Sequence, residues 1–444
     1  MCDKSHRYNK RNPMIKIKRT KIGYEEEPFL APFGFKGGYL SGAWQAVALM
    51  ESENGKQGLG LGTQNTLWSD AEIFLKNPEK AGNELMYRIT GEALRLAKEI
   101  PFETPIDLLE KLAPLAYEYG KKITDKDNLR LTFALNALVA VDNAAWQLYC
   151  AEKGITNFDR MVPAELKSGL PARHRELASI PLMSYGVPLK DIVAAVDDGY
   201  FFLKIKIGSD PDKDGDQEKM VRWDKERLSA IHEAVKDREI TYTKDGRIPY
   251  YLDANGRYDS KERLMRLLDH AQKIGALDRI LIMEEPFPEE YKVDVRDIPV
   301  RLAADESAHS DKDALERIEM GYRAIALKPI AKTMSMSLKI AKMAAERNIP
   351  CFCADLTVNP ILVDWNKNVA ARLSPLPGLK IGLLETNGHQ NYKNWETMRS
   401  YHTRYNAPWT KTTRGLFLLD DDFYACSGGI LEQNRHYLDL IQTQ

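Results

Sequence analysis

Three short apolar runs decide the fold of this chain: RILIMEEP at 279–286, VRLAADES at 300–307 and RAIALKP at 323–329. Each run is too apolar to expose one face to solvent, and each ends in charged residues. Parallel strands that are covered by helices on both sides have this character. The three runs therefore predict neighbouring strands of a buried parallel sheet.

The same pattern continues on both sides of these runs, from about residue 180 to residue 404. The expected strands are 181–185, 201–207, 249–254, 279–284, 300–304, 323–328, 350–354 and 380–385. The expected helices are 189–199, 216–236, 259–275, 311–320, 332–347, 358–372 and 390–404. Eight such strands close into a barrel, so we predict an α/β fold with a TIM-like (α/β)8 barrel over 175–404.

The residues before the barrel have a different pattern. We expect a polar tail over 1–13 and an N-terminal α+β capping domain over 14–160, completed by the C-terminal segment 405–444. Its helices are expected at about 68–78, 81–99, 104–119 and 128–153. Asn54-Gly55 favours a type I′ hairpin turn. Gly58, Gly60 and Gly62 follow at period two within a strand, which argues against a nucleotide-binding loop.

Charge and cysteine usage exclude several classes of partner. The chain of 444 residues has 63 Lys and Arg against 64 Asp and Glu, so we expect neither nucleic acid nor a membrane surface as a partner. No apolar run approaches the roughly 18 residues of a membrane span, and the polar start lacks the apolar middle of a signal peptide. Five scattered cysteines fit a reducing compartment. We therefore expect a cytoplasmic protein.

Charged residues end successive expected strands, at the barrel face where such enzymes carry their active sites. Because side chains alternate along a strand, Lys204 and Lys206 should point into the barrel mouth and the apolar residues between them toward the helices. The next strands end in Asp253, Glu284, Asp305 and Lys328. A barrel mouth with three carboxylates is unstable by mutual repulsion unless a cation neutralises it, and oxygen ligands suit a hard ion such as Mg²⁺.

The lysines add a base to this site. A partly desolvated lysine near a metal has a depressed pKa and can accept a proton near neutral pH. Lys206 and Lys328 lie on opposite sides of an eight-stranded ring. They therefore predict removal of a proton from a carbon next to a carboxylate, with Mg²⁺ stabilising the ene-diolate.

Five motifs together resemble the enolase superfamily, muconate-lactonizing-enzyme subgroup, in residue type, order and spacing. They are Lys204-x-Lys206, Asp253-x-Asn255, Glu284-Glu285-Pro286, Asp305-Glu306-Ser307 and Lys328-Pro329. This mandelate racemase/muconate lactonizing enzyme-like resemblance covers about 14–430. The mandelate-racemase subgroup uses a His after the seventh strand, where this chain has Cys351-Phe-Cys-Ala-Asp355.

The resemblance implies a role for each motif. Asp253, Glu284 and Asp305 would bind the metal, and Lys206 and Lys328 would form the acid/base pair. Lys204 would contact the substrate carboxylate. Asn255 and Glu306 would stand behind the ligands, and alternation turns Glu285 and Glu306 away from the barrel axis.

Candidate substrate contacts come from the capping segments and the last strand. Segments 28–42 and 63–70, with Phe33, Lys36, Tyr39 and Trp68, should close over the far end of the substrate. After the last strand, dipeptide epimerases of the subgroup carry Asp-x-Asp, whereas Gly382-Leu-Leu-Glu385-Thr-Asn387 is closer to the Gly-x-x-Glu-Ser/Thr of succinylbenzoate synthases and succinylamino acid racemases. Glu385, Asn387 and His309 complete the candidates.

The expected function is Mg²⁺-dependent racemisation or epimerisation of an acyl-amino acid or dipeptide-like substrate. Syn-elimination or cycloisomerisation, with one lysine as base, is the alternative within the subgroup. A metal-free lyase that forms a Schiff base through Lys328 is an alternative from another class. A catalytically inactive binding protein is less favoured, because an unused set of buried charges is costly. The expected partners are a small-molecule carboxylate and further copies of the chain in a homo-oligomer.

Overall fold

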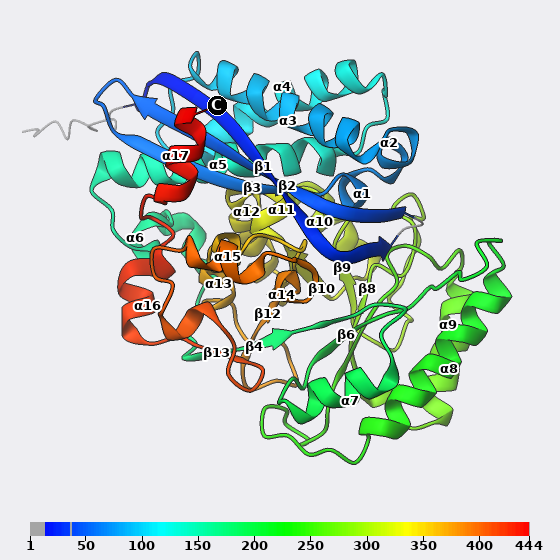
Figure 1. The fold of residues 1–444 in the computed structure, drawn as a ribbon. Helices are drawn as coiled ribbons and strands as arrows, with labels where there is room; N and C mark the ends of the chain where they lie inside the picture. The colour runs from blue at the N-terminus through cyan, green and yellow to red at the C-terminus, as the bar shows by residue number, and fades with distance from the viewer. Residues whose placement is uncertain (1–13, 36–37, 444) are drawn as a thin grey trace, which may run out of the picture.

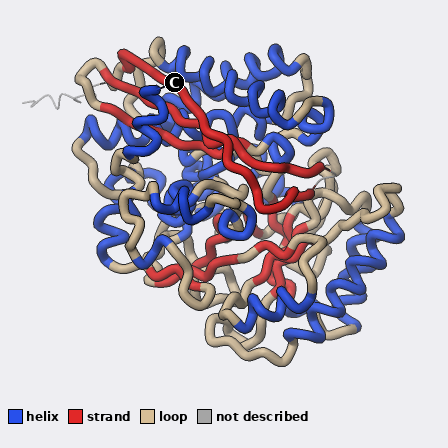
Figure 2. Tube along the Cα trace, viewed as in Figure 1, coloured by secondary structure: helices blue, strands red, loops and turns tan. Residues whose placement is uncertain are grey.

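The computed structural model describes residues 14–35 and 38–443, which form two connected parts (Figure 1). One part is an antiparallel sheet with helices packed on it, and the other is a parallel sheet with helices around it (Figure 2). The expected polar tail, 1–13, lies outside the described residues. Within the described residues, no helix combines the length and apolar character needed to cross a bilayer.

The N-terminal sheet has the order β1 (Ile17–Phe35), β2 (Gly38–Ser52) and β3 (Gln57–Gln64), all antiparallel. The turn between β2 and β3 is not the expected type I′ turn. Gly55 has a positive φ of 76°, but Asn54 does not, and the Gly55 N–H donates to the Ser52 carbonyl over 3.0 Å. This is a type I turn followed by a left-handed glycine, the usual three-residue hairpin loop.

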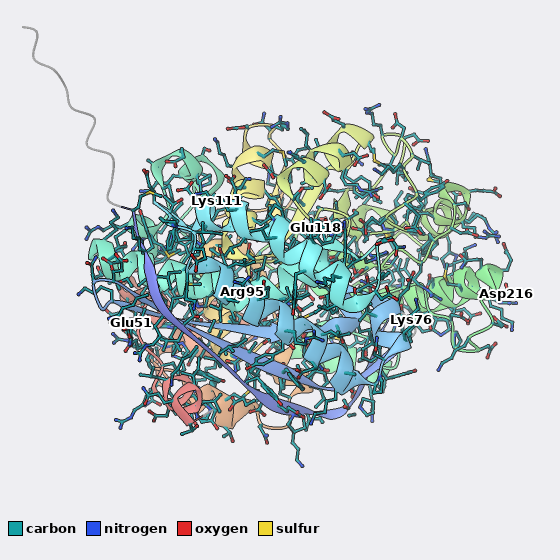
Figure 3. All side chains as sticks on the ribbon, turned by 90° about the horizontal axis from the view of Figure 1, so that it is seen from above. Glu51, Lys76, Arg95, Lys111, Glu118 and Asp216 are labelled. Carbon is teal, nitrogen blue, oxygen red and sulfur yellow. The ribbon has the colours of Figure 1, made fainter. Side chains whose placement is uncertain are left out.

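Helices cover one face of this sheet: α1 (Thr66–Ser69), α2 (Ala71–Lys76), α3 (Glu79–Ala97), α4 (Pro105–Thr124) and α5 (Leu131–Lys153). Charged side chains of both signs, among them Arg95, Lys111 and Glu118, project from α3 and α4 (Figure 3). In contrast, α5 is buried nearly all round, as its apolar sequence predicts.

The glycines of β3 serve helix packing. A Cβ atom at Gly58 would lie 2.1 Å from the Ala144 carbonyl oxygen, and one at Gly60 only 1.9 Å from that of Ala140. Both partners belong to α5, so the period-two glycines let the α5 backbone lie directly on the strand. α5 also reaches the barrel, where Asp142 accepts hydrogen bonds from the Ser335 hydroxyl (2.6 Å) and backbone N–H (3.0 Å).

The barrel closes through its first strand, which is divided at Pro181 and pairs with both edges of the sheet. β4 (Glu176–Ile180) pairs with β12, and β5 (Leu182–Met183), directly after the proline, pairs with β6. Both pairings are parallel, so β4 and β5 act as one strand joining the two edges of the sheet. The other strands are β6 (Leu203–Lys206), β7 (Tyr250–Asp253), β8 (Ile280–Glu284), β9 (Leu302–Ala304), β10 (Ala324–Leu327), β11 (Cys351–Cys353) and β12 (Gly382–Glu385). The TIM-like fold class is confirmed.

The first barrel strand differs from expectation. It begins at Glu176, five residues before the expected 181–185, because Leu177–Ile180 already lie buried in the sheet. The helices outside the barrel are α7 (Leu189–Asp197), α8 (Gln217–Val235), α9 (Lys261–Lys273), α10 (Asp311–Met320), α11 (Pro329–Lys332), α12 (Met334–Ala345), α13 (Pro360–Ala370), α14 (Gly388–Asn391) and α15 (Trp395–Ser400). Short elements complete the links: α6 (Phe158–Met161), η1 (Ala164–Gly169) and η2 (Leu277–Arg279).

The C-terminal segment touches both parts of the molecule. After η3 (Pro408–Thr410), β13 (Leu416–Leu418) adds an antiparallel strand beside β4 of the barrel. α16 (Asp421–Cys426) and η4 (Ser427–Gly429) follow, and α17 (Arg435–Thr443) then lies against β1 (Figure 1). His436 of α17 pairs with Glu25 of β1 over 2.9 Å. The segment therefore packs first on the barrel and only afterwards on the N-terminal sheet.

Candidate active site

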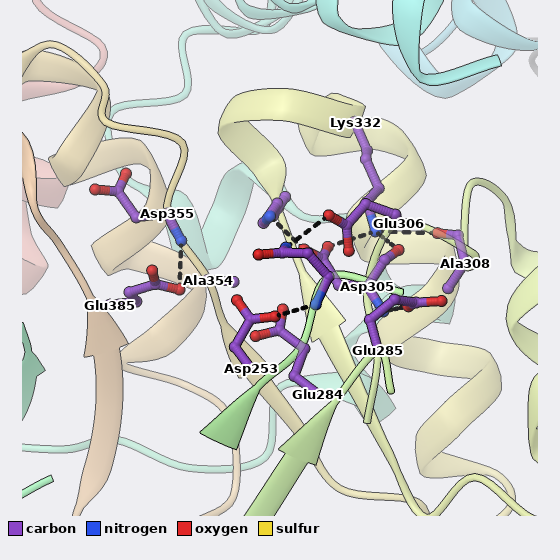
Figure 4. Close-up of polar contacts among 12 residues, drawn as sticks. Asp253, Glu284, Glu285, Asp305, Glu306, Ala308, Lys332, Ala354, Asp355 and Glu385 are labelled. Carbon is purple, nitrogen blue, oxygen red and sulfur yellow. Dashed lines mark hydrogen bonds and ion pairs between the residues drawn. The ribbon is translucent and has the colours of Figure 1, made fainter. Parts of the chain in front are cut away.

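The charged residues that end the barrel strands meet in one buried cluster. Lys206 lies opposite Asp253 in the pairing of β6 with β7, and Asp253 lies opposite Glu284 in the pairing of β7 with β8. The alternation expected along β6 is present, because Leu203 and Ile205 belong to the apolar cluster that includes the surrounding helices. Figure 4 shows the carboxylates of Asp253 and Glu284 side by side, with Asp305 next to them.

Lys204 connects three of the carboxylates at the barrel mouth. Its Nζ lies 3.0 Å from Asp253, 2.7 Å from Glu284 and 3.1 Å from Glu385. Burial alone would lower the pKa of Lys204, but these three carboxylates raise it well above its usual value. Burial likewise acts to raise the pKa of Asp253, yet Lys204 and Lys206 lower it to about 2. Lys204 and Asp253 are therefore both charged at neutral pH.

Lys206 and Lys328 occupy equivalent positions on opposite sides of the cluster. The Lys206 ammonium donates to Asp253 over 2.5 Å and also to the side-chain oxygen of Asn255. Asn255 in turn donates to Glu306 over 2.9 Å, so a chain of hydrogen bonds joins Lys206 to Glu306. On the other side, the Lys328 ammonium donates to Asp305 and lies 4.6 Å from the centre of the Trp68 ring.

Lys332 is a buried contact that the sequence did not single out. It lies one helical turn after Lys328 in α11, with its Nζ 3.1 Å from the Asp305 carboxylate and 3.2 Å from the Ala308 carbonyl oxygen. Burial opposes the charged form of Asp305, but Lys328 and Lys332 lower its pKa below the usual value. The i, i+4 spacing from Lys328 was the signal that could have revealed it.

The donor set fits a hard divalent ion in chemistry. Glu284 is fully buried, and its Oε1 accepts no hydrogen bond from the described residues. Burial and the charges of Asp253 and Asp305 raise the pKa of Glu284 well above its usual value, although the Lys204 ammonium lies 2.7 Å from it. Even so, across residues 14–35 and 38–443 no three His, Cys, Asp or Glu side chains are spaced to hold one metal ion. The Lys204 ammonium instead bridges Asp253 and Glu284.

Glu285 points away from this cluster. Its carboxylate accepts the backbone N–H of Asp305 over 2.7 Å and that of Ser307 over 3.4 Å. Burial and the nearby Glu306 raise the pKa of Glu285 to about 7. The residue therefore fixes the end of β9, which carries Asp305.

The other side of the mouth is formed by the ends of β11 and β12. Glu385 accepts hydrogen bonds from Lys204 (3.1 Å) and from the Asp355 backbone N–H (3.0 Å). Asp355 accepts the Asn387 backbone N–H over 2.8 Å, and the Thr357 hydroxyl donates to the Asn387 side chain over 2.7 Å. Sequence reasoning noted Asp355 only as part of a stretch without histidine, although it follows a strand as the other site residues do.

A narrow cavity of about 40 Å³ joins the two sides. It is lined by Phe33 and Trp68 of the capping segments, by Lys204, Lys206 and Lys328, and by residues of both sides of the mouth, namely Asp253, Asn255, Asp355, Thr357, Glu385 and Asn387. The structure thus brings most of the expected contacts to one place.

Two expected contacts, His309 and Tyr39, are not brought there. His309 does not line the cavity; it pairs with Glu289, which is also 3.1 Å from Arg130. Tyr39 is 58% exposed and lies near Lys213, outside the cavity. Lys36 lies outside the described residues. A histidine close to a strand end was therefore a misleading signal, because the ion pair with Glu289 turns it away.

Comparison with known proteins agrees with this architecture. Residues 189–381 match the family described as enolase C-terminal domain-like. No curated protein sequence matches the chain. A mandelate racemase/muconate lactonizing protein from Herpetosiphon aurantiacus shares the fold with 17% identity and a TM-score of 0.62, over 91% of this chain and 96% of that one. The expected resemblance to the enolase superfamily is confirmed.

Two further solved structures carry more specific names. A dipeptide epimerase from Enterococcus faecalis V583, complexed with Mg and the dipeptide L-Leu-L-Tyr, has 19% identity and a TM-score of 0.59 over 91% of this chain and 97% of that one. An N-succinyl Arg/Lys racemase from Bacillus cereus has 14% identity and a TM-score of 0.63 over 92% and 93%. At these identities the similarity shows a shared fold and nothing beyond it.

Proposed function

We propose that this chain is a Mg²⁺-dependent racemase or epimerase that removes the proton next to the carboxylate of a small molecule. The observation that carries the proposal is the placement of two buried lysines, Lys206 and Lys328, at the ends of strands β6 and β10, with both ammoniums lining one cavity. Three strands separate β6 from β10, so the two lysines approach the cavity from opposite sides of the ring.

The metal is assigned to Asp253, Glu284 and Asp305. Bound there, Mg²⁺ would replace the lysine ammoniums as the partner of these carboxylates and would stabilise the enediolate form of the substrate. The pKa of Lys328 supports this assignment: burial lowers it, but Asp305 raises it further, above its usual value. A base must be neutral before it accepts a proton, so the reaction requires that these carboxylates be engaged by a cation other than the lysines.

The residues of the chain would then have the following roles in the reaction. Lys204 lines the cavity beside Lys206, from where its ammonium would contact the substrate carboxylate. Lys206 takes the α-proton from one face, and the Lys328 ammonium returns a proton to the other; the reverse direction exchanges their roles. Phe33 and Trp68 line the same cavity and would exclude water from the carbanionic species.

The alternatives make different demands on Lys328. A metal-free Schiff-base lyase needs a neutral amine at this position, but without a metal ion nothing would release Lys328 from the Asp305 carboxylate, which holds it charged. Syn-elimination or cycloisomerisation needs one base only, and the second lysine would then act as a charge. The two lysines on opposite sides favour the two-base reaction.

Proton exchange in D₂O tests the proposal. The protein would be incubated with a library of α-substituted carboxylates, with Mg²⁺ or with EDTA, and deuterium at the α-carbon measured by mass spectrometry. We expect exchange with Mg²⁺ and none with EDTA. Borohydride trapping in parallel should give no covalent adduct. Absence of exchange from every substrate, or exchange that EDTA leaves unchanged, would contradict the proposal.

A further inference from the structure

A second cavity lies behind the end of β12, outside the active site. Its volume is about 460 Å³, within the roughly 300–1,000 Å³ that small-molecule sites have. Thr386 lines this second cavity, whereas its neighbours Glu385 and Asn387 line the active-site cavity. Neither Lys206 nor Lys328 is among the described residues around it, so a molecule bound there would not meet the two expected bases.

The second cavity has an apolar, largely aromatic wall. Tyr392 and Trp395 both line it and stack on each other, with 6.4 Å between their ring centres. Phe417 and Leu30 add apolar surface. Leu30 belongs to β1 of the capping domain and is 64% exposed, so its side chain is open to contact. This wall can therefore cover the apolar body of a ligand.

His389 contributes a polar group without a partner. Its ring lies against Trp395, with 6.2 Å between the ring centres, and its nitrogens form no hydrogen bond with the described residues. Burial lowers the pKa of His389 to about 4, so the ring is neutral near pH 7. A neutral imidazole donates one hydrogen bond and accepts another, and both remain available to a ligand.

Positive charge exceeds negative charge around the second cavity. Each carboxylate that lines it already has partners within the protein, namely Lys367 and His402 for Asp364 and Arg399 for Glu396. Lys393 and Lys411 line the cavity as well, and neither forms an ion pair with the described residues. Both lysines are exposed. Their uncompensated charge favours an anionic group beside the apolar wall.

We propose that the second cavity binds a small organic anion with a flat apolar body, such as an aromatic carboxylate or sulfonate. Lys393 and Lys411 hold the acidic group, and the apolar body covers Trp395 and Leu30. A cation of the same shape gains the same apolar contacts but is repelled by the two lysines, so the site discriminates by charge.

A pair of probes with the same ring system tests this preference. Naphthalene-1-sulfonate and 1-naphthylmethylamine, which have opposite charges, would each be titrated calorimetrically into the protein without Mg²⁺. We expect the sulfonate to bind about tenfold or more tightly than the amine, as for gain of a hydrogen bond to a charged group. Equal or tighter binding of the amine, or binding of neither probe, would overturn the inference.

Charge reversal locates the site. In the double variant Lys393→Glu/Lys411→Glu, affinity for the sulfonate should fall about tenfold or more. The matched control is Lys190→Glu/Lys312→Glu, which makes the same change in net charge at two exposed lysines outside the cavity and should keep the affinity within a few-fold, because salt screens distant charges. Wild-type affinity in the first variant would also overturn the inference. If that variant failed to fold, Leu30→Glu at the exposed edge of the cavity would replace it, with the same expected loss.

Discussion

The two sides of the barrel mouth are made of similar strand ends but carry different charge arrangements. On the side from β6 to β10, each aspartate has two lysine partners: Lys204 and Lys206 for Asp253, Lys328 and Lys332 for Asp305. On the β11–β12 side, none of the described residues forms an ion pair with Asp355, and Glu385 shares Lys204 with Asp253 and Glu284. If one lysine is removed from the first side, each aspartate keeps a second lysine partner, whereas Glu284 pairs with Lys204 alone among the described residues. The second side therefore holds fewer positive charges per carboxylate than the first.

Among the variants considered, removing a lysine from the first side should have the largest effect. The effect should be on the rate of racemisation and not on folding. With Lys206→Ala, racemisation should fall by roughly 10²–10⁴-fold or more, because a general base must lie within about 3 Å of its proton. Lys328 should still exchange the α-proton of the enantiomer that it faces, and Lys328→Ala should give the reverse. Deuterium incorporation into each enantiomer, separated by chiral chromatography, measures this.

The matched control is Lys332→Met. Lys332 also pairs with Asp305 but does not line the cavity, so the variant should lower stability and keep exchange of both enantiomers. Loss of all exchange in Lys206→Ala with no change in Lys328→Ala would instead indicate a one-base lyase or cycloisomerase.

Glu284→Gln tests the metal on the same side. The pKa of Glu284 is raised by burial and by its carboxylate neighbours, so a neutral glutamine should cost little stability, and Lys204 keeps Asp253 and Glu385. Mg²⁺ affinity, measured by calorimetric titration, should fall about 100-fold or more, since even residues behind a ligand matter 10- to 100-fold. Wild-type affinity in the variant would place the ion elsewhere.

The first side of the mouth could be predicted from the sequence because its signal is local. A charged residue at the end of an apolar strand must point into the barrel or toward the helices, and alternation decides between the two. This placed Lys204, Lys206, Asp253 and Glu284 correctly. The same rule applies to Asp355. However, the residue two positions before it is the uncharged Cys353, so this strand end lacks a pair of charged residues such as Lys204 and Lys206.

Features that depend on long-range contacts could not be predicted. His309 turns toward Glu289, and the ion pair joins loops that no local pattern relates. The barrel closes because the strand segments before and after Pro181 pair with β12 and β6, and the sequence does not reveal these pairings. The glycines of β3 are explained by α5, which lies about 80 residues later in the sequence and packs its backbone directly on the strand. Local periodicity predicts the helices and strands, whereas the contacts between them depend on tertiary packing.

The pH dependence of stability tests the protonation of Asp355 on the second side of the mouth. The pKa of Asp355 is raised to about 7 in the folded protein, so the folded state holds this proton more tightly than the unfolded chain. Its contribution to stability is complete below about pH 4 and is lost as pH rises through about 7. The free energy of unfolding of the wild type, relative to Asp355→Asn, should therefore fall by about 1.4 kcal/mol per pH unit within that window. Denaturant titrations from pH 4 to 8 measure this; an equal slope in both proteins would mean that Asp355 is ionised throughout.

The smallest effect is expected at Glu285, directly after the metal ligand Glu284. Its carboxylate accepts the Asp305 and Ser307 N–H groups, and a glutamine oxygen can accept the same bonds. Because burial already raises the pKa of Glu285 to about 7, a neutral side chain is tolerated there. Glu285→Gln should therefore change Mg²⁺ affinity by no more than a few-fold, although the substitution is chemically the same as Glu284→Gln one residue earlier. The two variants, titrated side by side, separate a side chain that faces the cavity from one that holds the neighbouring strand end. If Glu285→Gln lost Mg²⁺ binding and Glu284→Gln kept it, the strand would present the opposite face to the metal, since a shift of one residue reverses every side chain along it.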